Sequence, residues 1–415
     1  MNLLSPSLVI STPALARNIC TSALVFSQLI CSDVQSKTSL DNFLHSVQVH
    51  PERREGAYPY YLLHNAGDNV YGTVLIFHGL TSKPDQCWRL AQYLFDTGFN
   101  VYQPCIAAHY LINPDKNWPQ VDLKPQWKQP IREKFLADPV LSQALNAVDT
   151  VNNVTQEQLN FVMQRVNELS PDMADIISAI NVGDYSEKFQ RFYESSHLRY
   201  LQESESRLEE VQSLPGPIFT IGLSVGGAVA LGLAAAHPDK ISKVVAYAPL
   251  LRELNEVKRQ FSLKAGPLDV KETGWDPRLQ FTLGCFAATD VFKNHVNHDG
   301  NIDTLAHIPT FVALTENDDS ADIPTNQQFN ARLIARAGRS GTPHLESMYT
   351  SSEHVPHPIY DPIEARHCYN VDLSLLPDPD IVINKINTKT CPQSLLTSRT
   401  QNYPSYKQEV KKKEQ

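Results

Sequence analysis

The hydrophobic pattern is most regular from residue 57 onward. Aromatic and β-branched residues fill 57–64 and 71–79, with a glycine-containing turn signal between them, so both runs are predicted to be strands. Apolar residues then recur at helical spacing over 85–99, and 100–107 is another short apolar run. A strand, a helix and a strand in this order predict a βαβ unit, which requires a parallel sheet.

The same alternation returns in the second half of the chain. Apolar strands are predicted at 217–224, 241–251, 308–318 and 344–352, and helices follow the first and third of them. Together the two halves predict an α/β protein with a doubly wound, mostly parallel sheet. The residues of its loops should gather along one edge, at the carboxyl ends of the strands.

Amphipathic helices interrupt the sheet between its two halves. Thr155 and Gln158 form a predicted capping box at the start of one helix, Ser170 caps a second, and a third, long helix is predicted from Tyr185. The apolar faces of these helices either pack the insertion together, which is the simpler interpretation, or form a lid over an apolar pocket.

These patterns divide the chain into four parts. They are an N-terminal segment (1–50), an α/β core (51–118 and 214–385), a helical insertion or cap (119–213) and a C-terminal tail (386–415).

Composition and charge exclude several classes of function. The chain of 415 residues is 42% hydrophobic and 20% charged, which is ordinary for a globular protein. A formal net charge of -9 without a clustered basic face argues against nucleic-acid binding, and the lysine-rich end is interpreted as a solvated tail. No run of about 20 apolar residues predicts a transmembrane segment. The oligomeric state is left open.

The first residues match a secretory signal only in part. Arg17 comes late, and polar residues interrupt the apolar stretch 19–31. A cytoplasmic location is therefore favoured, with export as the alternative.

The seven cysteines include no CxxC pair, so no zinc or thioredoxin-type site is predicted. No metal or organic cofactor is expected. Cys87 and Cys105 are predicted to be small buried apolar residues, and Cys368 and Cys391 could form a bridge in an oxidising compartment.

One serine lies in a nucleophile motif. Gly222-Leu223-Ser224-Val225-Gly226 matches GxSxG where a predicted strand gives way to a helix. The turn would expose Ser224 in a strained conformation, and a Cβ at Gly222 or Gly226 would clash with neighbouring backbone. Ser224 is the predicted nucleophile; the alternative is one polar residue in a tight turn.

A serine nucleophile needs a base to remove its proton. His354 directly follows the last predicted strand and is the predicted base, with His357 as the alternative. His344 and His367 are assigned to local hydrogen bonds instead.

The base needs a carboxylate that orients its ring. Asp318 at the end of an apolar strand is the predicted acid, and the nearby Glu316, Asp319 and Asp322 are interpreted as solvated.

An anionic intermediate needs two donors. The backbone N–H groups of Val225 and Leu80 are the predicted oxyanion hole, and His78 is expected to shape the loop that carries Leu80.

Four segments together resemble one family. The residues 74–104, 219–249, 308–319 and 351–357, with the versions HGLT and GLSVGG, resemble the α/β-hydrolase carboxylesterases and monoacylglycerol-lipase-like enzymes, and look closest to small bacterial carboxylesterases. The resemblance covers about half of the chain. It implies an α/β-hydrolase fold with the helical insertion as a cap.

The resemblance also implies the site. Ser224 would be the nucleophile, His354 the base and Asp318 the acid, with Leu80 and Val225 as oxyanion donors. The loop 105–110 departs from the family because it lacks a glycine-rich turn, and a proline-rich stretch replaces the closing helix after His354.

The expected function is therefore cleavage of carboxylic esters through an acyl-enzyme. The substrate would be a small-molecule ester or a lipid. A lipase or lysophospholipase, an amide or thioester hydrolase with the same triad, and a non-catalytic binding protein of the same fold are the alternatives.

Overall fold

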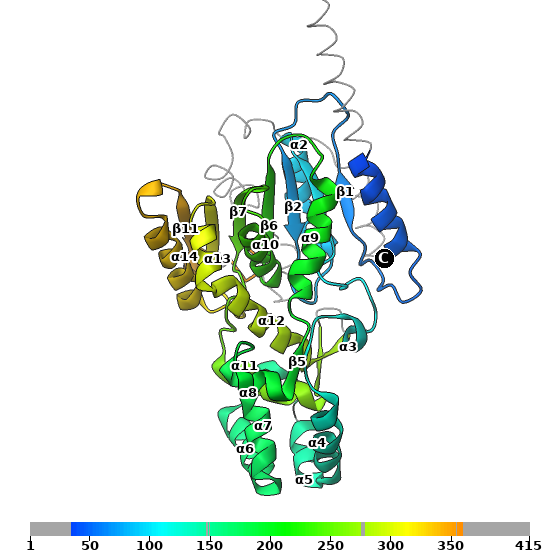
Figure 1. Ribbon diagram of the computed structural model, residues 1–415, viewed down its shortest axis with the longest axis vertical. Helices are drawn as coiled ribbons and strands as arrows, with labels where there is room; N and C mark the ends of the chain where they lie inside the picture. Colours follow the sequence, from blue (N-terminus) through cyan, green and yellow to red (C-terminus); the bar gives the residue numbers. More distant parts are fainter. Residues whose placement is uncertain (1–34, 147, 149, 275–278, 354, 360–415) are drawn as a thin grey trace, which may run out of the picture.

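The computed structural model describes residues 35–146, 148, 150–274, 279–353 and 355–359. Residues 35–48 are helical, and the chain then enters a seven-stranded sheet (Figure 1). The sheet has the order β1-β3-β2-β6-β7-β10-β11, and each neighbouring pair is parallel except β1 with β3. The predicted α/β class with a mostly parallel sheet is confirmed. Its strands are β1 (Tyr60–Leu62), β2 (Thr73–Phe77), β3 (Asn100–Gln103), β6 (Ile218–Leu223), β7 (Ile241–Tyr247), β10 (Thr310–Thr315) and β11 (His344–Tyr349).

Helix α10 (Val225–Ala236) lies at the centre of the packing. Its sequence, VGGAVALGLAAA, is apolar on every side, which suits a helix that is buried all round. It packs on β6 and β7 and contacts α9, α12 and α13. Small residues allow the close approach, since a Cβ at Gly232 would lie 3.0 Å from Phe292 Cζ. The helices around the sheet are α2 (Trp88–Asp96), α9 (Arg199–Val211), α10, α12 (Leu283–Asn297), α13 (Asp299–Leu305) and α14 (Ile323–Ala337).

A second group of elements lies below the sheet in Figure 1, and we call it the lower lobe. Strands β4 and β5 pair antiparallel and bring the start and the end of one inserted segment side by side. Further elements come from later in the chain. The lobe consists of α3 (Pro114–Asn117), β4 (Val121–Leu123), α4 (Pro125–Ala137), α5 (Pro139–Asn146), α6 (Gln156–Leu169), α7 (Pro171–Ser178), α8 (Glu187–Phe192), β5 (Tyr193–Ser195), α11 (Glu256–Ala265), β8 (Lys271–Thr273) and β9 (Gln280–Thr282).

The helix starts in the lower lobe are capped as predicted. Thr155 and Gln158 form a reciprocal capping box on α6, and the Ser170 hydroxyl accepts a hydrogen bond from the Met173 amide at the start of α7. The single long helix predicted from Tyr185 is wrong. The chain leaves α8 at Phe192 to pair as β5 with β4, and α9 begins only at Arg199.

The apolar face of α6 is buried inside the lower lobe. Val162 and Val166 line a small pocket together with Ile177 of α7 and Phe261 of α11. These contacts favour the interpretation that the apolar stripes hold the insertion together.

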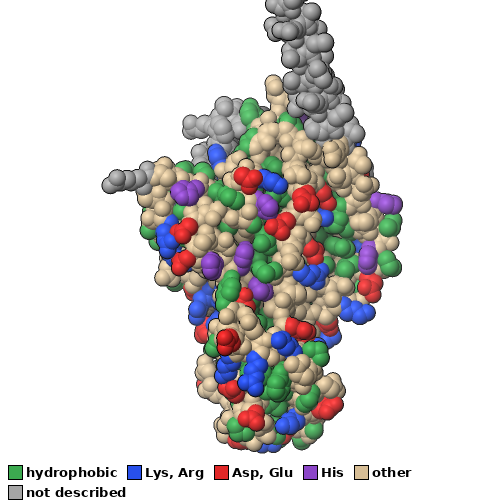
Figure 2. Space-filling view, viewed as in Figure 1, with side chains coloured by type: hydrophobic (Ala, Val, Ile, Leu, Met, Phe, Trp, Pro, Cys, Tyr) green, Lys and Arg blue, Asp and Glu red, His purple; other side chains and the backbone are tan. Residues whose placement is uncertain are grey.

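The described surface is mixed in charge. Figure 2 shows Lys and Arg side chains interspersed with Asp and Glu over this face of the molecule. Cys87 and Cys105 are buried, as predicted, whereas Cys368 and Cys391 lie outside the described residues. Within the described ranges, no helix combines the length and apolar character needed to cross a membrane.

Candidate active site

The turn between β6 and α10 holds Ser224 in a strained conformation. Its backbone has φ 55° and ψ -121°, a region that non-glycine residues rarely adopt. Two hydrogen bonds hold the turn: the Ser224 amide donates to Tyr247 O at 3.0 Å, and the Leu250 amide donates to Ser224 O at 2.9 Å. Because both partners belong to β7 or the loop after it, the neighbouring strand supports the strained turn.

Only glycine fits on either side of Ser224. A Cβ at Gly222 would lie 2.0 Å from Gly226 O, and a Cβ at Gly226 would lie 2.2 Å from Phe77 O. Contacts this short with backbone atoms cannot be relieved by moving a side chain. The start of α10 therefore lies directly against the end of β2.

Other strained residues lie at the same edge of the sheet. Besides Ser224, the described non-glycine residues with positive φ include Ala107 and Ala108 after β3 and Ala248 after β7. Three strands thus end in unusual backbone conformations, a feature that concentrates at functional sites. The loop 105–110 lacks glycine, yet Ala108 has φ 61° and adopts the left-handed turn without one.

Buried hydrogen bonds shape the loop after β2. The His78 ring links Gly79 O, 2.8 Å from Nδ1, to the Ile106 amide, 3.2 Å from Nε2. The Gly79 amide donates to Gln86 Oε1 at 3.1 Å. Burial lowers the pKa of His78 to about 3, so its ring is neutral near pH 7 and serves as a bridge between loops.

The backbone amides of the two predicted oxyanion donors lie next to Ser224. Among the described residues, neither the Leu80 amide nor the Val225 amide donates a hydrogen bond to protein. The loop approaches the serine closely, since a Cβ at Gly79 would lie 3.9 Å from Ser224 Cβ. Both amides belong to segments that border Ser224.

A carboxylate and a histidine form a buried couple after β10. His357 Nδ1 lies 2.9 Å from Asp318 Oδ1 and 3.0 Å from Oδ2. Asp318 Oδ1 also accepts the amides of Ser320 at 2.8 Å and Ala321 at 2.7 Å. Burial opposes the charged imidazole, but Asp318, with smaller contributions from Asp319 and Glu253, outweighs it and raises the pKa of His357 above 6.5.

The histidine of this couple differs from the predicted base. His354 lies outside the described residues, and the alternative, His357, is the histidine that contacts Asp318. The reason lies in how the chain returns from β11. Thr315 Oγ1 donates to Val355 O, and Pro356 bridges to Asn317, so the segment after His354 is held against the end of β10.

The order of the strands and the turn at Ser224 identify the fold. A GxSxG serine lies between the central strand β6 and a buried helix, at the edge of the sheet where Asp318 follows β10. The chain has the α/β-hydrolase fold.

The comparisons with known proteins find related folds alone. No protein-family model and no curated protein matches the sequence. Similar solved structures include a monoglyceride lipase from Saccharomyces cerevisiae with a substrate analogue, at 15% identity, 84% of this chain, 95% of that chain and TM-score 0.45. A structure of the metagenome-derived lipolytic enzymes LipS and LipT is 11% identical, with 80% of this chain and 97% of that chain covered and a TM-score of 0.45. Est1E from Butyrivibrio proteoclasticus with ferulic acid is 12% identical, with 80% of this chain and 94% of that chain covered and a TM-score of 0.41. Identities and TM-scores this low say nothing about the substrate of this chain.

The other acidic residues of the hydrolase fold's β10 loop have local partners. Glu316 Oε2 accepts the Ser351 amide, Asp319 Oδ1 accepts the Ser320 hydroxyl, and Asp322 caps α14 through the Thr325 amide.

The remaining predicted histidines lie away from the couple. His344 Nε2 is 3.1 Å from Ala306 O at the opposite end of β11, and His367 lies outside the described residues. Across the described ranges, no group of three or more His, Cys, Asp or Glu residues could hold a metal ion.

Two supporting residues were missed by the sequence analysis. Gln86 holds Gly79, and the buried Arg54 donates to the carbonyls of Thr81 at 2.8 Å and Ser82 at 3.0 Å. Both fix the loop that carries Leu80. No local sequence pattern identifies either residue, because each is recognised only by its contact with the loop 79–82, whose conformation could not be predicted from the sequence.

Proposed function

We propose that this protein is a serine hydrolase that cleaves carboxylic esters through an acyl-enzyme. Ser224 is the nucleophile, His357 the base and Asp318 the acid, with the amides of Leu80 and Val225 as oxyanion donors. The observation that carries the proposal is the strained Ser224 turn at the sheet edge that also bears the buried Asp318–His357 couple.

The chemistry follows from the hydrogen bonds of His357. Its Nδ1 faces Asp318, which fixes the tautomer and leaves Nε2 to accept the Ser224 proton. Ser224 Oγ then attacks the ester carbonyl, and the two amides bind the oxyanion. His357 returns the proton to the leaving alcohol and afterwards activates the water that releases the acid.

A fluorophosphonate probe tests the nucleophile without a known substrate. We expect the wild type to be modified on the peptide that contains Ser224, and Ser224→Ala to stay unmodified. Equal modification of both proteins would contradict the assignment.

Matched substrates test the type of bond. An ester, a thioester and an amide with the same short acyl group are compared by kcat/KM, with Ser224→Ala as the background for each. We expect the ester to react fastest. An amide that reacts at least as fast as the ester would replace the esterase proposal with an amidase.

A further inference from the structure

A buried ion pair lies close to the Asp318–His357 couple and has no role in the proposed mechanism. Glu253 and Lys258 are each 8% exposed, and Lys258 Nζ lies 3.1 Å from Glu253 Oε1. Glu253 is in the loop after β7, and Lys258 is in the first turns of α11. Two buried charges cost solvation energy, so their retention beside the site calls for a function.

The main chain of Glu253 holds the turn that carries Asp318. Glu253 and Ala321 form an antiparallel bridge. On either side, the Leu254 amide donates to Ser320 O at 2.8 Å and the Asp322 amide donates to Arg252 O at 2.9 Å. The residues Ser320 and Ala321 in turn donate their own amides to Asp318 Oδ1. A shift of the Glu253 segment would therefore move Asp318.

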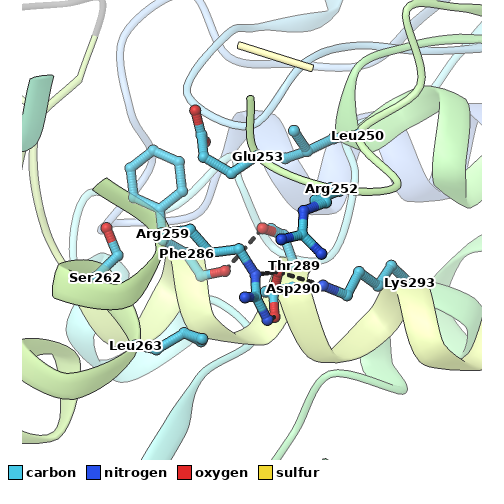
Figure 3. A pocket seen from close by; sticks show the side chains of 10 residues that line it. All are labelled: Leu250, Arg252, Glu253, Arg259, Ser262, Leu263, Phe286, Thr289, Asp290 and Lys293. Atoms are coloured by element: carbon cyan, nitrogen blue, oxygen red, sulfur yellow. Dashed lines mark hydrogen bonds and ion pairs between the residues drawn. The ribbon is translucent and has the colours of Figure 1, made fainter. Parts of the chain in front are cut away.

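The other charged residues that line the cavity beside Glu253 form ion pairs of their own. This cavity is lined by Glu253 and by a cluster in which Arg259 and Lys293 both contact Asp290, at 2.7 Å and 2.6 Å (Figure 3). Arg252, which also lines it, pairs with Glu256 at 2.7 Å. In Figure 3 the Glu253 carboxylate points away from the Asp290 cluster.

Three carboxylates favour the charged form of His357. Asp318 is in direct contact, and Asp319 and Glu253 act over longer distances; each raises the pKa of His357 against the effect of burial. The influence is mutual. Burial raises the pKa of Glu253, while Lys258 and His357 lower it and Asp318 raises it.

We propose that Glu253 and Lys258 are a positioning pair for the catalytic couple. The Glu253 carboxylate stabilises the imidazolium that forms when His357 takes the serine proton, Lys258 holds that carboxylate in place, and the main chain of Glu253 fixes the Asp318 turn. This inference rests on the proposed function.

The test measures the rate at which a fluorophosphonate labels Ser224 as a function of pH. Labelling requires neutral His357, so the midpoint of the profile reports the ionisation of that residue. Glu253→Gln removes a negative charge and should lower the midpoint by about 0.5–1 pH unit. Lys258→Gln leaves Glu253 without the cation that lowers its pKa, so burial favours the neutral carboxyl and the midpoint should fall in this variant as well. This variant carries the test if Glu253→Gln does not fold.

The control variant is Glu256→Gln. Glu256 lies in the same helix as Lys258, is about half exposed and pairs with Arg252, and its loss should leave the midpoint unchanged. A midpoint that rises in Glu253→Gln or in Lys258→Gln, or no shift in either variant, would overturn the inference.

Failure of the proposed function gives a different result. In that case the wild type is not labelled at all. A ¹⁵N NMR titration of the His357 imidazole in the same variants then decides the inference, with a lowered midpoint expected in both variants and its absence overturning the inference.

Discussion

At the scale of single residues, the proposed activation of Ser224 depends on the contact between His357 and Asp318. The couple is buried, and its carboxylate is held on one oxygen by two amides. His78, also buried, has its pKa lowered to about 3 and no carboxylate in contact. Burial, with a contribution from Arg54, favours the neutral imidazole of His78, whereas the carboxylates near His357, Asp318 above all, favour its charged form.

The raised pKa of His357 predicts an acid limb in the activity. Only neutral His357 can take the serine proton, so kcat/KM should fall as the pH drops through a value above 6.5. Asp318→Asn should lower both the rate and the midpoint of this limb. A pH profile from about 5 to 9 with a short-chain ester measures it. Full activity retained well below pH 6.5 would contradict the assignment.

The raised pKa of His357 affects activity and stability in opposite directions as the pH rises: activity should increase, whereas the contribution of His357 to stability should decrease. His357 binds its proton more tightly in the folded chain than in the unfolded one. Its contribution to the free energy of unfolding is therefore complete below the unfolded-state pKa, and it is lost as the pH rises through the folded-state value.

At the same scale, the strained turn at Ser224 and the need for glycine on both sides of it could be predicted from the sequence, whereas the contact between His357 and Asp318 could not. The GxSxG turn carries its steric requirement in five consecutive residues, whereas the base depends on how a loop closes between two strands. The bridge from Pro356 to Asn317 brings His357 to Asp318, and no local pattern around His354 reveals that contact.

At the scale of elements, the start of α10 lies against the end of β2. Gly226→Ala would place a methyl group 2.2 Å from Phe77 O and should destabilise the fold by about 4 kcal/mol or more. Urea unfolding measures the loss. Gly300→Ala is the control, because the nearest atom to its Cβ is a side-chain atom 3.4 Å away and the cost should stay within about 1 kcal/mol. Equal losses of unfolding free energy in the two variants would contradict the close packing of α10 against β2.

The regular elements followed from hydrophobic periodicity, and the irregular ones did not. Each predicted strand of the sheet is present. The inner strands β2, β3 and β10 are buried along their whole length, as expected of apolar runs in a parallel sheet. The long helix predicted from Tyr185 is interrupted because residues 193–195 pair with β4. In this pairing Tyr193 lies opposite Leu123, which is 70 residues earlier in the chain. Pairing over such distances overrides local helical spacing.

At the scale of the whole molecule, the lower lobe and the sheet share elements that are far apart in sequence. Helix α11 joins the lobe, and α9 packs against α10 beside the sheet. The apolar faces of α6 and α7 are buried within the lobe. The two helices pack on each other, and residues of both line one pocket with residues of α11. The loop after β7 leads directly into α11 of the lobe, and its Leu250 amide donates to Ser224 O.

The central claim is that Ser224 is activated by His357. The most direct test compares the rates at which a fluorophosphonate labels wild type, His357→Gln and His354→Gln near pH 8. We predict that His357→Gln slows labelling by about 10³-fold or more, while His354→Gln stays within a few-fold of wild type. The reverse order, with labelling lost in His354→Gln and kept in His357→Gln, would contradict the account.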